Sequence, residues 1–94
     1  MAETEKAVTR TLSDGHVVTI GGRVTMGDFR RWAKAERAGE FEAVYKHLAQ
    51  VVQAWDYEGD PSQPESYDDL TFQEYRRVNE AAGEWLRSEV EAKN

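Results

Sequence analysis

The chain has 94 residues, of which 39% are hydrophobic and 11% aromatic, so it suits one ordered domain and excludes wholesale disorder. Its formal net charge of −6 disfavours nucleic acid and anionic membranes as partners, because both need a basic surface. The absence of cysteine excludes disulfides and thiolate sites.

The first twenty residues predict a short tail followed by a β-hairpin. Residues 1–6 are polar and lack the apolar segment of a signal peptide, so we expect a frayed tail on a cytoplasmic protein. Residues 7–20 are rich in β-branched side chains, and Asp14-Gly15 near their middle suits a two-residue turn. Such a turn places the apolar side chains of the two strands on opposite faces, so the inward face of the hairpin stays undecided.

Two helix starts share one pattern. Thr25 and Thr71 each follow an apolar residue and precede an acid three positions on, Asp28 and Glu74. The threonine accepts a hydrogen bond from a free N–H of the first turn, and the acid accepts one from the threonine N–H. The pattern therefore predicts a capping box at both positions.

Three helices are predicted at about residues 26–38, 40–55 and 72–90, from apolar residues that recur every three or four positions. Gly39 suits a left-handed stop after the first helix. The second helix has the most regular apolar stripe, formed by Phe41, Val44, Tyr45, Leu48, Val51, Val52 and Trp55.

These elements together predict one α+β, mostly α domain over residues 7–94, in which an N-terminal β-hairpin packs on three helices. Residues 56–69 join the last two helices. This linker, which we call the acidic linker, contains Gly59, Pro61 and Pro64 and holds six acids but no base.

No chemical motif accompanies these elements, so we predict neither an enzyme nor a cofactor. His16 lies in the turn and His47 on a helix, and no nucleophile and acid are spaced to join either of them. The acidic linker begins like a calcium-binding loop at Asp56, but its sixth and twelfth positions hold Pro61 and Tyr67 instead of glycine and glutamate. We expect a solvated loop without a metal.

Two groups of side chains are candidates for contact with a partner. The aromatic group lies around the acidic linker and on the last helix: Trp55, Tyr57, Tyr67 and Trp85. Such residues are frequent both in binding hot spots and at core edges. Trp55 continues the apolar stripe of the second helix, which favours a core position for it. For Tyr57 and Tyr67 in the acidic linker, a core position and a partner contact are equally favoured. The basic group is expected to form a solvated face of the first helix, and its charge also suits self-association: Arg30, Arg31, Lys34 and Arg37.

The order of these parts has a parallel in a known family. A hairpin is followed by the helix start Thr25-Met26-Gly27-Asp28-Phe29, by the break Ala38-Gly39-Glu40, and by Trp55 beside an acidic, proline-containing linker. This order resembles the small tail assembly chaperones of long-tailed bacteriophages, over roughly residues 9 to 90.

The resemblance implies a non-enzymatic protein that coats the apolar, helical tape-measure protein and helps bring tail-tube subunits to it. It implies action in the cytoplasm of the bacterial host and absence from the mature virion. Many members also exist in a longer form made by translational frameshifting, and 94 residues suit the short form. Self-association is left open. Two alternatives are a small acidic inhibitor that mimics nucleic acid and a structural component of the virion or head–tail joint.

Overall fold

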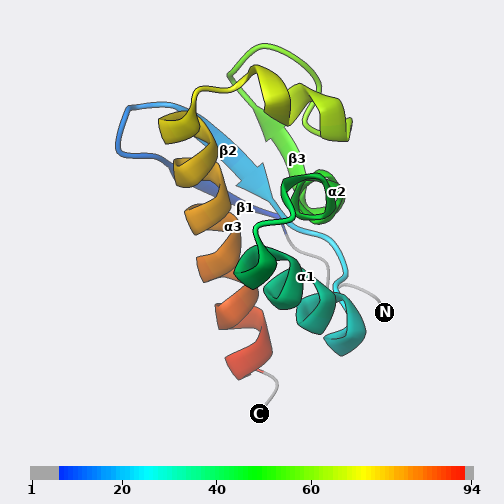
Figure 1. Cartoon of the computed structure of the whole chain (residues 1–94). Coiled ribbons are helices and arrows are strands. Elements are labelled where there is room, and N and C mark those ends of the chain that lie inside the picture. The colour runs from blue at the N-terminus through cyan, green and yellow to red at the C-terminus, as the bar shows by residue number, and fades with distance from the viewer. Residues whose placement is uncertain (1–6, 93–94) are drawn as a thin grey trace.

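The computed structural model describes residues 7–92 and confirms an α+β, mostly α architecture (Figure 1). Residues 1–6, predicted as a tail, and residues 93–94 lie outside this range. An antiparallel sheet of order β1-β2-β3 is covered on one face by the helices. The elements in chain order are β1 (Val8–Thr11), β2 (Val17–Ile20), α1 (Met26–Ala38), α2 (Phe41–Val51), β3 (Val52–Trp55), the 3₁₀ helix η1 (Pro64–Asp69) and α3 (Phe72–Ala92).

Both predicted capping boxes are confirmed. The Thr25 hydroxyl accepts a hydrogen bond from the Asp28 N–H at 3.1 Å, and the Asp28 carboxylate accepts one from the Thr25 N–H at 3.2 Å. Thr71 and Glu74 exchange the same two bonds at 3.1 and 2.9 Å. These local bonds fix where α1 and α3 begin.

The hairpin turn differs from the prediction and thereby settles the inward face. The Leu12 N–H donates to the His16 carbonyl at 2.7 Å, so Leu12 pairs with His16, whereas a two-residue turn would pair it with Val17. The loop has three residues and ends at Gly15, whose φ of 90° is a left-handed conformation that suits glycine. This shift of one residue brings the apolar side chains of both strands to one face: Val8, Leu12, Val18 and Ile20.

The prediction that the second helix continues to residue 55 is wrong. Helix α2 ends at Val51, and Val52 adopts extended dihedral angles of −84° and 109°. From there β3 pairs with β2, placing Val52 opposite Ile20 and Trp55 opposite Val18. Two consecutive valines favour a strand, and β2, which lies far earlier in the chain, supplies the pairing partners Val18, Thr19 and Ile20. Where an apolar stripe of helical spacing ends in β-branched residues, those last residues are therefore also compatible with a strand.

The core lies between the sheet and the helices. Most predicted stripe positions are buried there, including Trp32 of α1 and Leu48 of α2. Two predicted stripe positions are instead exposed to solvent: Phe41 is 52% exposed and Phe72 is 64% exposed. Each of these rings belongs to the first residue of its helix, where the stripe extends beyond the core. The fully buried large side chains are Tyr67, Ile20, Leu48, Val18, Val44, Val51, Val52 and Val78.

Two glycines are expected to respond to alanine in opposite directions. Gly39 ends α1 with φ at 71°, so Gly39→Ala should lower the free energy of unfolding by about 1–2 kcal/mol. Gly83 lies inside α3, where an added Cβ would meet only an Arg87 nitrogen at 4.0 Å. Gly83→Ala should therefore raise the free energy of unfolding by up to about 1 kcal/mol. Urea unfolding of both variants checks this pair, and equal effects would contradict it.

Candidate partner-binding surface

Seven aromatic rings form a continuous chain across the molecule. Neighbouring ring centroids lie 4.2 to 5.9 Å apart, which is the range of favourable ring contacts. The chain connects α2, α3, η1, β3 and the hairpin turn, in the order Phe41, Tyr75, Tyr45, Tyr67, Trp55, Tyr57 and His16. We call these seven residues the aromatic chain.

The structure brings three of the four predicted contact residues into this aromatic chain. Tyr67 is its middle member and is only 1% exposed, whereas Trp55 and Tyr57 are half-buried. Trp85 is 3% exposed and lies outside the aromatic chain. Tyr67 and Trp85 are therefore core residues in this conformation, and Trp55 and Tyr57 present only their outer edges to solvent.

Tyr67 attaches the acidic linker to the body of the protein. Its hydroxyl donates a hydrogen bond to the Pro61 carbonyl at 2.8 Å, and its ring packs between Tyr45 and Trp55. Burial raises the pKa of the Tyr67 hydroxyl, so it stays protonated and remains a donor. The Trp55 indole N–H also holds the linker, because it donates a hydrogen bond to the Gly59 carbonyl at 2.9 Å. The linker is consequently ordered, and η1 forms within it.

The most exposed rings are Phe41, which ends the aromatic chain, and Phe72, which lies outside it. We define the docking patch as Phe41, Tyr45, Phe72 and Tyr75. The ring centroids of Phe41 and Tyr75 are 5.9 Å apart, and Phe72 lies three residues before Tyr75 on the same helix face. Burial, with the Glu36 carboxylate as a smaller cause, raises the pKa of Tyr75 to about 12, so its ring stays uncharged.

Sequence reasoning missed Phe41 and Phe72 because both fit their apolar stripes. The signal that distinguishes them is their position, since each is the first residue of its helix and follows a capping residue. The Arg76 guanidinium lies over the Phe72 ring at 5.9 Å from its centroid, and Phe72 is still 64% exposed.

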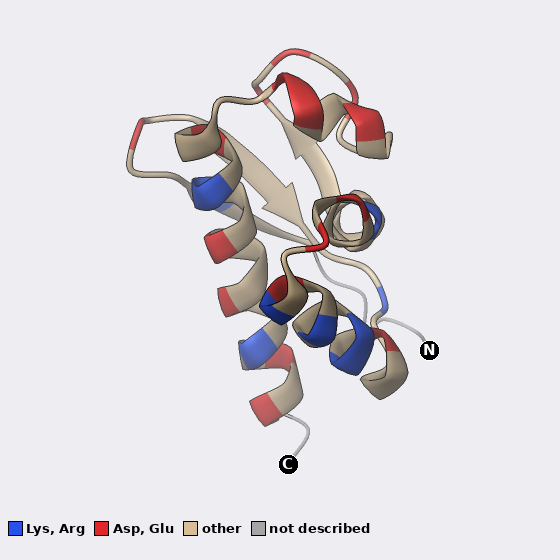
Figure 2. Ribbon diagram, in the orientation of Figure 1, with Lys and Arg blue, Asp and Glu red and all other residues tan. Residues whose placement is uncertain are grey.

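Carboxylates lie on the elements that carry part of the docking patch. Glu40 and Glu42 are exposed at the start of α2, and Asp68 and Asp69 are exposed at the end of η1 (Figure 2). Burial and a hydrogen bond with Asp68 raise the pKa of the Tyr45 hydroxyl, which keeps that ring neutral as well. The predicted basic residues of α1 are exposed on a separate helix, and α2 packs between α1 and η1. The docking patch therefore offers uncharged rings, with carboxylates on the α2 and η1 side and the Arg76 guanidinium beside Phe72.

A hydrogen-bonded cluster closes the far end of the aromatic chain. Asp14 accepts hydrogen bonds at 3.0 Å from the Tyr57 hydroxyl and from the His16 backbone N–H, and it lies 3.4 Å from the Arg77 guanidinium. The His16 ring stacks on Tyr57 with centroids 4.2 Å apart. This cluster joins the hairpin turn to the acidic linker and to α3.

The Asp14 cluster predicts a loss of stability in acid. Partial desolvation raises the Asp14 pKa, but the bonds from His16 and Tyr57 outweigh it and hold the pKa below the usual 3.8. The stabilisation is therefore present above the unfolded-state pKa and is lost as pH falls through the folded-state pKa. Asp14→Asn should flatten the fall in the free energy of unfolding below about pH 4. Urea unfolding at several pH values checks this, with Glu58→Gln as a control of equal charge change; identical pH profiles for the two variants would contradict it.

A comparison with known proteins found no relative of the chain: no protein family model, curated protein or solved structure matches it. Within residues 7–92, no cluster of histidine and carboxylate side chains has the arrangement of a metal site. None of the helices in that range combines the length and apolar character that a membrane span requires.

Proposed function

We propose that this protein is a tail assembly chaperone of the long-tailed bacteriophage type, which binds an apolar helical segment of the tape-measure protein without catalysing a reaction. The observation that supports it best is the docking patch, whose Phe41 and Phe72 rings are exposed, with four exposed carboxylates on α2, its N-cap and η1. In this proposal the protein also helps deliver tail-tube subunits, acts in the host cytoplasm and is absent from the mature virion.

The chemistry of the docking patch matches such a segment. An amphipathic helix presents apolar side chains three, four and seven residues apart, and these can cover neighbouring rings on two helices. Glu40, Glu42, Asp68 and Asp69 would attract lysine or arginine residues that flank the apolar stripe. Four rings provide much less than the roughly 800 Å² per partner of a standard stable interface. The contact is therefore reversible. A chaperone that leaves the tape-measure protein before the tail is complete needs such a reversible contact.

Co-expression with the candidate tape-measure protein encoded nearest to this chain tests the proposal. We expect the long protein to become soluble and to co-elute with several copies of this chain. Phe41→Ala/Phe72→Ala should abolish that effect, because it removes the two exposed rings. Met26→Ala is the matched control, since Met26 is 58% exposed at the start of α1 and contributes nothing to the docking patch. An insoluble tape-measure protein, with this chain eluting alone, would overturn the proposal.

A second candidate function is an acidic inhibitor that occupies the nucleic-acid site of another protein. One observation favours it, because the acidic linker is ordered by η1 and presents six exposed carboxylates. This function depends on charge, so Asp68→Asn/Asp69→Asn should weaken binding to a basic target while Phe41→Ala/Phe72→Ala leaves it unchanged. The reverse result favours the chaperone, and recovery of the chain from purified particles favours a structural virion role instead.

A further inference from the structure

Strand β1 is an edge strand, and no strand formed by residues 7–92 pairs with its outer side. Leu12 bonds to His16 across the hairpin at 2.7 Å, so Arg10, two residues earlier, also directs its backbone groups toward β2. The alternating residues Thr9 and Thr11 direct their N–H and carbonyl groups away from β2, and both are exposed. Among residues 7–92, β1 has a strand neighbour on one side only.

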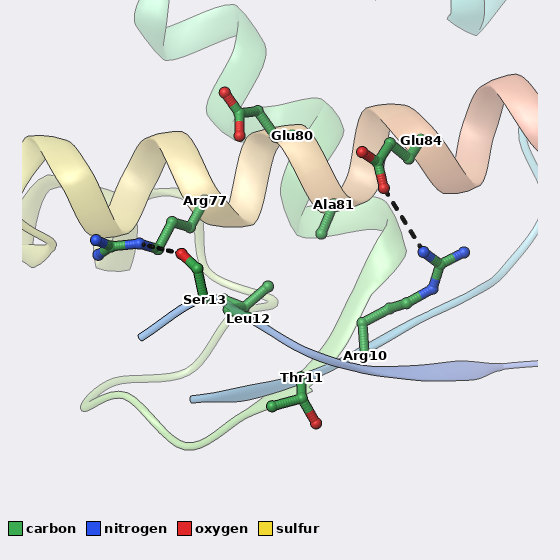
Figure 3. Close-up of a pocket in the computed structure, with 8 residues that line it drawn as sticks. All are labelled: Arg10, Thr11, Leu12, Ser13, Arg77, Glu80, Ala81 and Glu84. Carbon is green, nitrogen blue, oxygen red and sulfur yellow. Dashed lines mark hydrogen bonds and ion pairs between the residues drawn. The ribbon is translucent and has the colours of Figure 1, made fainter. Parts of the chain in front are cut away.

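A polar groove runs beside this open edge. It has a volume of about 200 Å³ and lies between β1 and α3, as Figure 3 shows. Arg10 on the strand approaches Glu84 on the helix at 3.7 Å. Glu84 and Glu80, one helical turn apart, have side chains that are 66% and 65% exposed. The groove is lined by Arg10, Thr11, Leu12, Ser13, Arg77, Glu80, Ala81 and Glu84.

The exposed carboxylates of this groove suit a second arginine side chain. An inward-pointing charge such as Arg10 normally protects an edge strand from pairing, because a second strand would bury it. Here the helix supplies two exposed carboxylates: Glu84 pairs with Arg10, and Glu80 pairs at 3.5 Å with Arg76 of its own helix, a surface pair of small energy. The other guanidinium of the groove, Arg77, is held by Ser13 and Asp14. A second Arg10 in the same groove would bind Glu80 in place of its weak pair with Arg76.

We propose that two copies of the chain pair through β1, antiparallel and across a twofold axis, to form one six-stranded sheet. Pairing through Thr9 and Thr11 places Arg10 of the second copy opposite Val8, Arg10 or Leu12 of the first. All three of these residues face the helices. The second guanidinium therefore enters the groove beside Glu80 and Glu84, and the twofold axis repeats the arrangement in the other copy.

The helices leave room for this arrangement. Helix α3 packs against β2, so the two α3 helices would lie over strands that are three strand spacings apart. That separation is about 14 Å, which exceeds the 8–10 Å between packed helices and leaves space for the arginine and glutamate side chains. The other edge strand is less suitable, because the pairing of β3 with β2 shifts register between Thr19 and Ile20.

Sedimentation over a range of concentrations tests the pairing. We expect a concentration-dependent dimer that Glu80→Gln/Glu84→Gln weakens by about tenfold. Glu89→Gln/Glu91→Gln makes the same charge change on α3 outside the groove and should leave the dimer unchanged. Arg10→Glu should make the chain monomeric, and Arg10→Glu/Glu84→Arg should restore the dimer because it exchanges the two charges. A wild-type chain that is monomeric at all concentrations would overturn the proposal.

Hydrogen exchange identifies the strand that pairs. The amides of Thr9 and Thr11 should become more protected as protein concentration rises, whereas the Glu58 amide in the acidic linker should not change. A dimer without this protection, or one that Glu80→Gln/Glu84→Gln leaves intact, would overturn pairing through β1. The inference does not depend on the proposed function, since Phe41→Ala/Phe72→Ala should dimerise like the wild type.

Discussion

Replacing Tyr67 by alanine is expected to lower the free energy of unfolding by about 3–5 kcal/mol. The side chain is 1% exposed and fills the space between η1 and α2, where it contacts the rings of Tyr45 and Trp55. The surrounding residues belong to different elements and cannot all close the cavity. Urea unfolding followed by circular dichroism gives the change directly.

Tyr67→Phe separates the ring from its hydroxyl. It keeps the packing but leaves the Pro61 carbonyl without its donor, and Pro61 is buried, so a smaller loss of about 1–3 kcal/mol is expected. Equal losses for Tyr67→Phe and Tyr67→Ala would show that the hydrogen bond rather than the ring dominates. A loss below about 1 kcal/mol for Tyr67→Ala would contradict the core position of this residue.

Leu48→Ala should cost about 2–5 kcal/mol of unfolding free energy. Leu48 is fully buried in the middle of α2, between the sheet and the other helices, and its removal leaves an apolar cavity. Phe41→Ala on the same helix is the control. Its ring is 52% exposed, so the loss should stay below about 1 kcal/mol. Similar losses for the two variants would mean that the apolar stripe of α2 is not divided into a buried and an exposed part.

The features that the sequence predicts correctly depend on neighbouring residues. The capping boxes at Thr25 and Thr71 need only the acid three positions later, and the stop at Gly39 needs only its own left-handed φ. Both helices consequently begin where predicted, and α1 also ends where predicted. Periodicity likewise identifies Leu48 as a core residue.

The features that the sequence does not predict depend on distant partners. Whether Val52 continues a helix or begins a strand is decided by β2, and the length of the hairpin turn decides on which face Leu12 lies. The candidate site divides in the same way. Tyr67 is a core residue because α2 and β3 enclose it, and Phe41 is exposed because nothing within residues 7–92 covers the start of α2.

The direct passage from α2 into β3 has a mechanical consequence. Residues 41–55 change from helix to strand with no loop between them, and Val51 and Val52 at the junction are both buried in the core. A ligand that displaces Phe41 at one end of this segment should therefore also displace the part of the sheet at its other end. Trp55 stands at that far end, in ring contact with Tyr57 and Tyr67. Its indole fluorescence, which adds to that of Trp32 and Trp85, should therefore respond to an event at the opposite end of the segment.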